Sequence, residues 1–161
     1  MSTPLAVSRG EACRIYLRGE LGKLAPQTWV EEVVSGLSDG DAVTVASVLS
    51  LCRNNGVSRD LANGARFELV TVPVEHVLLR PAEPVLRERF EANGWSLVRI
   101  ACDDRVLRTK PYVDYPTGHG VEYSVLLARA EGEKYRVIDG MHRAIQLARN
   151  GEPALELCSI N

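Results

Sequence analysis

The spacing of hydrophobic residues predicts helices in the first third of the chain. Apolar residues recur three or four positions apart in three successive stretches, which is the period of helices with one buried face. Ser8 with Glu11, and Thr28 with Glu31, have the spacing of capping boxes, in which two side chains bond the first amides of a helix. We therefore predict that residues 8–66 are helical.

The rest of the chain carries strand patterns interrupted by one short helix. Residues 67–79 are rich in β-branched and leucine side chains, and Pro73 confines part of this run to a sheet edge or a turn. Pro84 suits the first position of a short helix, which Asn93 and Gly94 would end. Together with the helices before them, these patterns predict an α+β fold. Further strands are predicted at residues 95–101, 123–127, 134–138 and 154–160.

Residues 135–151 have the clearest local pattern and the clearest chemistry. A short strand leads into the turn-forming pair Asp139-Gly140, and apolar residues at helical spacing then continue to a glycine stop. A glycine at such a turn lets a ligand approach the backbone, and the first amides of the helix attract anions. His142 and Arg143 can add charged donors. The pattern predicts a phosphate or carboxylate site, and the alternative is a structural turn whose charged side chains face solvent.

Composition narrows the class of protein. The chain has 161 residues, 45% of them hydrophobic and 25% charged, which is typical of one globular domain. The net charge of −2 provides no general attraction to nucleic acid or to anionic membranes. A helix-turn-helix reader of DNA is disfavoured, because only Arg53 and Arg59 decorate the third helical region. No apolar run is long enough to span a membrane and no signal peptide begins the chain, so we expect a cytoplasmic protein.

The cysteine pattern argues against a zinc site. The four cysteines are far apart and lack the paired spacing of zinc ligands. We therefore expect reduced thiols and no zinc site. The four are Cys13, Cys52, Cys102 and Cys158.

The segment Ile-Asp-Gly-Met-His-Arg, residues 138–143, resembles the Asp-Gly-x-His-Arg motif of the ParB/sulfiredoxin-fold superfamily. Members include sulfiredoxins, ParB nucleotide-binding domains, ParB-like nucleases and free-serine kinases. The resemblance implies a small mixed sheet with packed helices over residues 67–161, with an insertion at about 99–122. Residues 1–66 are unmatched and form an N-terminal helical extension in this interpretation, which allows a homodimer through these helices.

The motif itself separates the branches of this superfamily. Sulfiredoxins carry a nucleophilic cysteine where this chain has Met141, which cannot attack a substrate. Partition proteins carry two arginines at the motif and a DNA-binding domain behind it, whereas this chain has His142-Arg143 and ends at Asn161. The resemblance therefore implies a nucleotide-dependent phosphotransferase acting on a hydroxylated amino acid or related metabolite, with ATP or ADP and Mg²⁺.

The resemblance also assigns roles to residues at the motif. Asp139 would hold the magnesium ion or orient the acceptor, Gly140 would admit the phosphates, and Met141 would contact the substrate. His142 and Arg143 would stabilise charge on the transferred group, since phosphoryl transfer depends mainly on positioning and electrostatics.

Two further roles lie outside the motif. Glu83 would be the catalytic base, with Glu75 a weaker candidate, and the alternative role for Glu83 is a favourable charge at a helix start. The polar and aromatic insertion at 103–119 is either a substrate lid or a surface loop. As a lid it would bring Tyr112 and His119 to the substrate.

Two other functions remain open. The anion site could serve a lyase or cyclase that uses no nucleotide, because one fold hosts many chemistries. A non-enzymatic regulator that binds a nucleotide is the third class.

Overall fold

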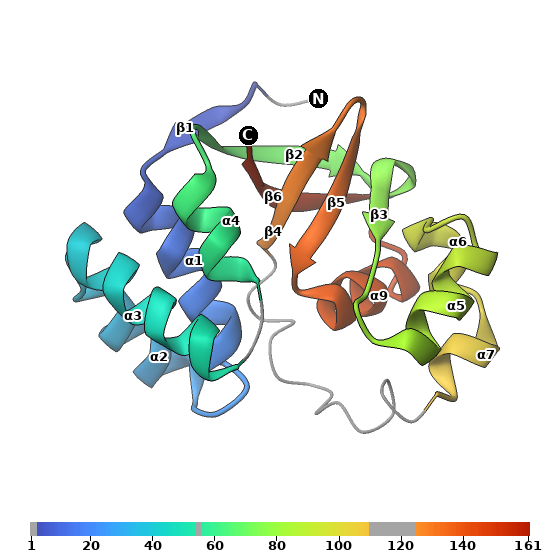
Figure 1. The fold of residues 1–161 in the computed structure, drawn as a ribbon, viewed down its shortest axis with the longest axis horizontal. Helices are drawn as coiled ribbons and strands as arrows, with labels where there is room; N and C mark the ends of the chain where they lie inside the picture. Colours follow the sequence, from blue (N-terminus) through green and yellow to red (C-terminus); the bar gives the residue numbers. More distant parts are fainter. Residues whose placement is uncertain (1–2, 54–55, 110–124) are drawn as a thin grey trace.

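The computed structural model describes residues 3–53, 56–109 and 125–161. These residues form helices and a six-stranded mixed sheet, which confirms the predicted α+β class (Figure 1). In chain order the elements are β1 (Leu5–Val7), α1 (Arg9–Leu21), α2 (Gln27–Ser35), α3 (Asp39–Cys52), α4 (Val57–Asn63), β2 (Phe67–Pro73), η1 (Val74–His76), β3 (Val77–Leu79), α5 (Pro84–Ala92), α6 (Leu97–Ala101), α7 (Asp104–Leu107), β4 (Leu126–Glu131), β5 (Lys134–Asp139), α9 (Met141–Arg149) and β6 (Ala154–Ile160).

The sheet has the strand order β1-β2-β6-β4-β5-β3. β2 and β6 form a long antiparallel pair, with Phe67 opposite Ile160 and Pro73 opposite Ala154. β6 runs parallel to β4, β4 runs antiparallel to β5, and β5 runs parallel to β3. β5, which ends at Asp139, therefore lies between β4 and the edge strand β3.

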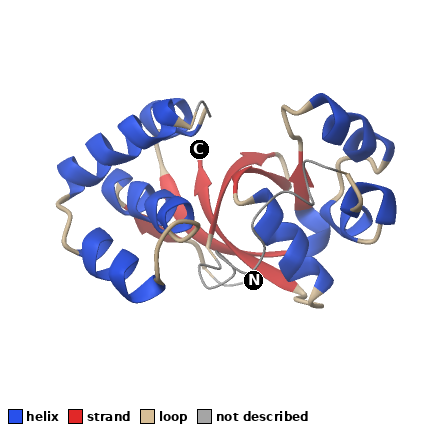
Figure 2. Cartoon of the chain, turned by 90° about the horizontal axis from the view of Figure 1, so that it is seen from below, coloured by secondary structure: helices blue, strands red, loops and turns tan. Residues whose placement is uncertain are grey.

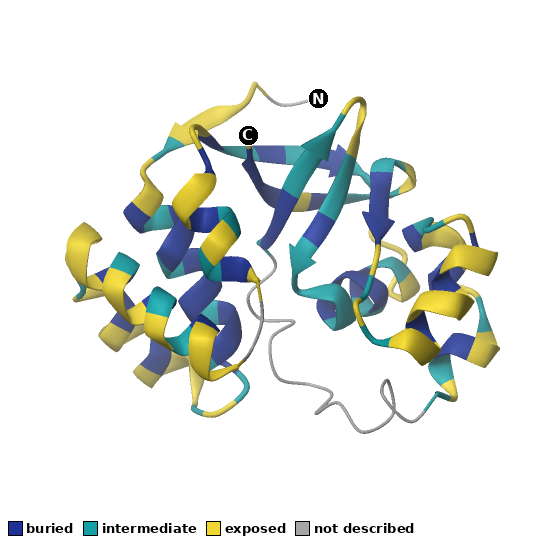
Figure 3. Cartoon of the chain, in the orientation of Figure 1, coloured by how far each residue is buried: buried dark blue, intermediate teal, exposed yellow. Residues whose placement is uncertain are grey.

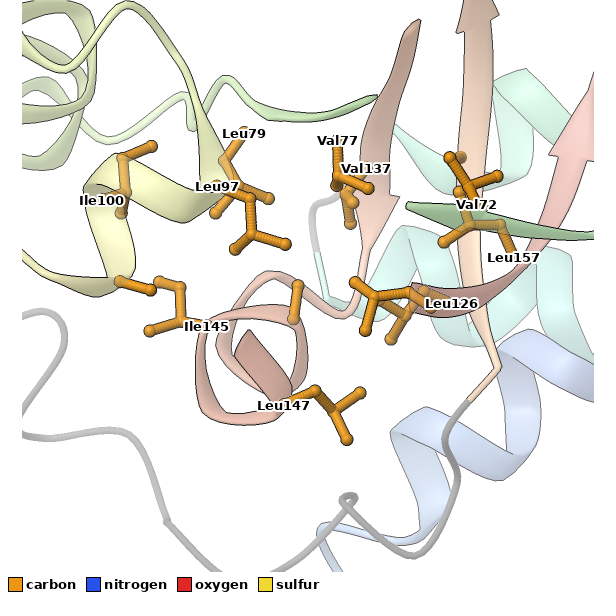
Figure 4. Packing of buried hydrophobic residues seen from close by; sticks show 14 of the residues in the cluster. Val72, Val77, Leu79, Leu97, Ile100, Leu126, Val137, Ile145, Leu147 and Leu157 are labelled. Carbon is orange, nitrogen blue, oxygen red and sulfur yellow. The ribbon is translucent and has the colours of Figure 1, made fainter. Parts of the chain in front are cut away.

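Alternate residues of the strands face two separate hydrophobic cores. Leu155 and Leu157 of β6 pack with the helices α5, α6, α7 and α9, whereas Cys158 and Ile160 pack with α1 to α4. Successive side chains of a strand point to opposite faces, so a strand covered on both faces is apolar almost throughout. Figure 2 shows the sheet between the two groups of helices, and Figure 3 shows how strongly its strands are buried. Figure 4 shows the core that contains Leu157 and the helices α6 and α9 in detail.

The N-terminal 66 residues are part of this layered arrangement. β1 pairs with β2, with Leu5 opposite Leu69. A strand of three residues is too short to be predicted from its hydrophobic pattern. α1 packs against α2, α3 and β4, and the core beneath these helices includes Phe67 and Leu127 of the sheet. The boundary at residue 66 therefore divides two parts of the chain that share one sheet.

The helix cap predicted at Ser8 is confirmed, and the second predicted capping box is wrong. The amide of Glu11 donates to Ser8 Oγ at 3.0 Å, which begins α1. α2 instead follows Pro26, with no capping side chain, and Thr28 lies inside its first turn. Proline already has the φ angle that leads into a helix, so this helix begins before the predicted box.

Residues 95–101, predicted as a strand, form a helix from residue 97. Ser96 caps α6 by accepting from the Arg99 amide. Leu97, Ile100 and Ala101 are all buried, at the spacing of a helix that packs against its neighbours. The β-branched residues of this short run favoured the strand prediction, and the tertiary contacts outweighed that preference.

The other predicted strands are present, with residues 154–160 forming β6 as predicted and the bounds of the others shifted. Residues 67–79 form two strands, β2 and β3, separated by the 3-10 turn η1 that follows Pro73. β4 and β5 form a hairpin, and β4 continues through Glu131, beyond the predicted end at residue 127. Gly132, in the left-handed conformation, makes its turn.

The strand, turn and helix predicted for residues 135–151 are confirmed. β5 ends at Asp139, α9 begins at Met141, and Gly151 follows the helix with φ +84°. The four cysteines are free thiols, of which Cys13 and Cys158 are buried.

Two expectations about the outer surface of the protein concern membrane-spanning helices and a homodimer. In the described ranges, no helix is long and apolar enough to cross a membrane. α2 and α3 expose apolar side chains, and a homodimer through these helices stays a prediction. These side chains are Trp29, Val33, Val45 and Val48.

Candidate functional site

A cleft of about 520 Å³ lies where β5 runs into α9. Its floor is residues 136–142; one wall is Lys23 with the start of α4, and the other is the β3–α5 connection, residues 79–83. We call this hollow the β5 cleft. Its volume is that of a typical small-molecule site, and both groups of helices contribute to it.

The turn at the inner end of the β5 cleft requires glycine. Gly140 has φ +99°, and a Cβ on it would lie 2.6 Å from Leu126 Cδ2 and 2.9 Å from Arg143 Nη2. α9 begins directly after it without a capping side chain, and Met141 and His142 line the cleft. A ligand can therefore approach the start of α9, where the helix dipole favours a negative charge.

Arg143 lies behind this turn. Its side chain is 3% exposed, its Nη2 lies 3.2 Å from Asp139 Oδ2, and its Nη1 donates to the Val125 carbonyl at 3.3 Å. Gly19 of α1 makes room for it, because a Cβ there would lie 2.6 Å from Nη2. Sequence reasoning expected Arg143 to face the anion, and the structure places it in the interior, where it holds Asp139.

Two acidic side chains meet at the inner end of the cleft. Burial raises the pKa of Asp139 to about 6, and the negative charge and hydrogen bond of Glu20 act in the same direction, while Arg143 and Lys23 oppose them. Glu20 is itself buried on α1 and pairs with Lys23 Nζ at 2.7 Å and Arg53 Nε at 3.3 Å. A hydrogen bond between two carboxyl groups requires a proton on one of them, so Asp139 can hold a proton close to neutral pH.

Glu83 lies on the wall opposite Gly140. It caps α5, and its Oε2 accepts from the Leu86 amide at 2.8 Å. Glu83 is also among the residues that line the β5 cleft. Glu75 lies in η1 and is not among the residues that line the cleft.

The motif turn is not a preformed metal site. Among the described residues, no three His, Cys, Asp or Glu side chains gather as metal ligands, and Asp139 is already paired with Arg143. A magnesium ion here would take most of its ligands from phosphate and water, as Mg²⁺ commonly does. Tyr112 and His119 lie outside the described residues.

Thiol chemistry has no support at this turn. Met141 occupies the position before His142, and burial raises the pKa of Cys158 to about 12. A thiol with so high a pKa is protonated at neutral pH and is a poor nucleophile.

Sequence reasoning missed Glu20 and Lys23, because they lie in the segment that the family resemblance leaves unmatched. One local signal was present. Gly19 lies inside the predicted first helix, and a glycine within a helical pattern often marks a close approach by another part of the chain. The approaching side chain is Arg143.

Comparison of the chain with models of known protein families, with curated proteins and with solved structures found no match. The resemblance of residues 138–143 to the ParB/sulfiredoxin-fold motif therefore stays a sequence-based hypothesis.

Proposed function

We propose that the protein is a nucleotide-dependent phosphotransferase of the ParB/sulfiredoxin fold that acts on a hydroxylated amino acid or related metabolite in the cytoplasm. Its main support is that Glu83 and the Asp139-Gly140 turn, far apart in sequence, line one cleft of small-molecule size. A base and an anion site on one cleft are the two parts that transfer of a phosphoryl group to a hydroxyl requires.

The residues of the β5 cleft divide the work between them. A bound nucleotide would supply the phosphoryl group. Lys23, His142 and the first amides of α9 donate to phosphate oxygens and offset their charge, and Gly140 lets the oxygens reach those amides. Arg143 holds Asp139 in place from behind. Glu83 takes the proton from the acceptor hydroxyl.

Nucleotide binding is tested first by calorimetric titration with ATP, ADP and CTP, each with and without Mg²⁺. Turnover is then measured as phosphorylated product formed from a panel of hydroxylated amino acids. A chain that binds none of the three nucleotides is not a nucleotide-dependent phosphotransferase.

Glu83→Gln is expected to lower turnover at least 100-fold, the usual contribution of a general base, and to leave the nucleotide Kd within about twofold. Glutamine keeps an acceptor oxygen for the Leu86 amide, so the cap of α5 should persist. The control is Glu88→Gln, an exposed residue of the same helix. A Glu83→Gln variant as active as this control would exclude Glu83 as the base.

A lyase or cyclase without a nucleotide is the second candidate, and Asp139 favours it. A carboxyl group with a pKa of about 6 can both donate and accept a proton near neutral pH. The same titrations separate the two candidates, because only the phosphotransferase needs a nucleotide to bind.

The affinity of the cleft for a simple anion is expected to fall roughly tenfold, or about 1.4 kcal/mol, as the pH rises through 6. Below this pH the Asp139 carboxyl is neutral, and above it the carboxylate repels the anion. Sulfate is the suitable probe, because its own charge does not change over this range. Calorimetry between pH 5 and 8 measures the effect.

Two variants identify the titrating group. Glu20→Gln removes a negative charge that raises the pKa of Asp139, so the fall in sulfate affinity should move to lower pH. An imidazole group also changes charge in this pH range, and His142→Gln removes it. The fall in sulfate affinity should therefore persist in this variant, because Asp139 is still present. A sulfate affinity independent of pH in the wild type contradicts the prediction.

A further inference from the structure

Two arginines line the β5 cleft at the end of its floor away from Gly140. Arg136 lies on β5, and Arg80 follows β3. Both are paired with the same carboxylate: Arg136 Nε lies 2.6 Å from Glu131 Oε1, and Arg80 Nη1 lies 3.3 Å from Glu131 Oε2. One acid thus holds two guanidinium groups at one end of the cleft.

Most donors of these two guanidinium groups are unused by the described part of the chain. Each group has five N–H donors, and each uses one nitrogen on Glu131. The side chains of Arg80 and Arg136 are 44% and 29% exposed, so a ligand can reach them.

The charge around this pair is not balanced. Arg129 lies directly opposite Arg136 in the β4–β5 register, and its Nη2 pairs with Asp60 at 3.0 Å. Three arginines therefore share two carboxylates, an excess of one positive charge among these five residues. Like charges placed opposite each other on neighbouring strands destabilise a sheet, and an anionic ligand would relieve the repulsion.

A constrained tryptophan supports the position of Arg80. Among the described residues, Trp95 is the one non-glycine with positive φ, at +62°, a conformation that bulky residues rarely adopt. Its carbonyl accepts from the Leu79 amide at 2.9 Å, and its ring centroid lies 5.8 Å from Arg80 Cζ. This contact lies within cation–π range and limits where the guanidinium can go.

We propose that Arg80 and Arg136 form a second anion subsite of the β5 cleft, which takes the carboxylate of the acceptor while the phosphoryl group lies at the Gly140 turn. The acceptor is then a hydroxylated carboxylic acid. Arginine donors match the geometry of a carboxylate. Arg80 and Glu83 lie on the same wall, so an acceptor held by its carboxylate lies along the wall that carries the base. The identity of the acceptor rests on the proposed function, whereas the anion subsite at Arg80 and Arg136 does not depend on it.

The test follows the Nε–H signals of Arg80 and Arg136 and the Gly140 amide by NMR during titration. The probes are sulfate, ADP, serine, and serine amide, which lacks the carboxylate. We expect sulfate to shift both sets of signals, ADP to shift the Gly140 amide, and serine to shift the arginine signals at a concentration at least tenfold lower than serine amide.

The matched variants are Arg80→Gln with Arg136→Gln, and Arg87→Gln as an exposed control on α5. Measured by calorimetry, the double variant should lose the preference for serine over its amide and keep its ADP affinity within twofold, while Arg87→Gln changes neither. Arginine signals that respond to no anion overturn the subsite. A double variant that loses ADP affinity instead shows that the arginines hold a nucleotide phosphate, which overturns the acceptor assignment. If the arginines respond to serine while the Gly140 amide ignores ADP, the proposed function fails and the subsite stands.

Discussion

Gly140→Ala is expected to destabilise the fold by roughly 2 to 6 kcal/mol. A non-glycine residue held at φ +99° costs about 1 to 3 kcal/mol in backbone strain. The new methyl group would also lie 2.6 Å from Leu126 Cδ2, and such overpacking of a core typically costs another 1 to 3 kcal/mol. Both effects act at the turn that begins α9, so we also expect weaker sulfate binding.

Urea unfolding of Gly140→Ala and of Gly132→Ala separates the two causes. Gly132 also has positive φ, at +65°, but no heavy atom lies within 4 Å of its added Cβ. The Gly132 variant should therefore lose only about 1 kcal/mol, the cost of the left-handed conformation alone. Equal losses in the two variants would show that the turn is not closely packed against Leu126.

Arg143→Met is expected to cost about 3 to 5 kcal/mol, the usual effect of removing one partner from a buried ion pair. Methionine fills most of the space but leaves the Asp139 carboxyl and the Val125 carbonyl without this donor. The loss should be larger at pH 8 than at pH 5. Arg143 lowers the pKa of Asp139, so its removal raises that pKa further above the ordinary value of 3.8. The folded variant then binds a proton that the unfolded chain releases, and its stability falls as the pH rises through that window.

Arg149→Met is the matched control, since Arg149 is an exposed residue in the last turn of the same helix. It should change stability by less than about 1 kcal/mol, mainly through the lost interaction with the helix dipole. Urea unfolding of both variants at pH 5 and pH 8 measures the difference. A loss in Arg143→Met no greater than in the control would mean that this arginine does not hold the turn together.

The motif could be predicted from the sequence because its signals are local. A strand, the Asp139-Gly140 turn and a helix of 3.6-residue period follow each other within residues 135–151, and each depends on neighbours in the chain. The position of Glu83 was predictable for the same reason, because Pro84 marks the start of α5. The sequence by itself thus determined the α+β class, the strand, turn and helix of residues 135–151 and a carboxylate at the start of a nearby helix.

Only the tertiary structure decided which way Arg143 faces and which residues complete the cleft. An arginine in the first turn of a helix can point outward or inward, and the choice here depends on Gly19 of α1, which leaves room for a buried guanidinium. Glu20 and Lys23 reach Asp139 because α1 packs on the sheet, a contact that no local pattern encodes. Periodicity specifies which face of a helix is buried, but not what is buried against it. The raised pKa of Asp139 therefore depends on long-range packing.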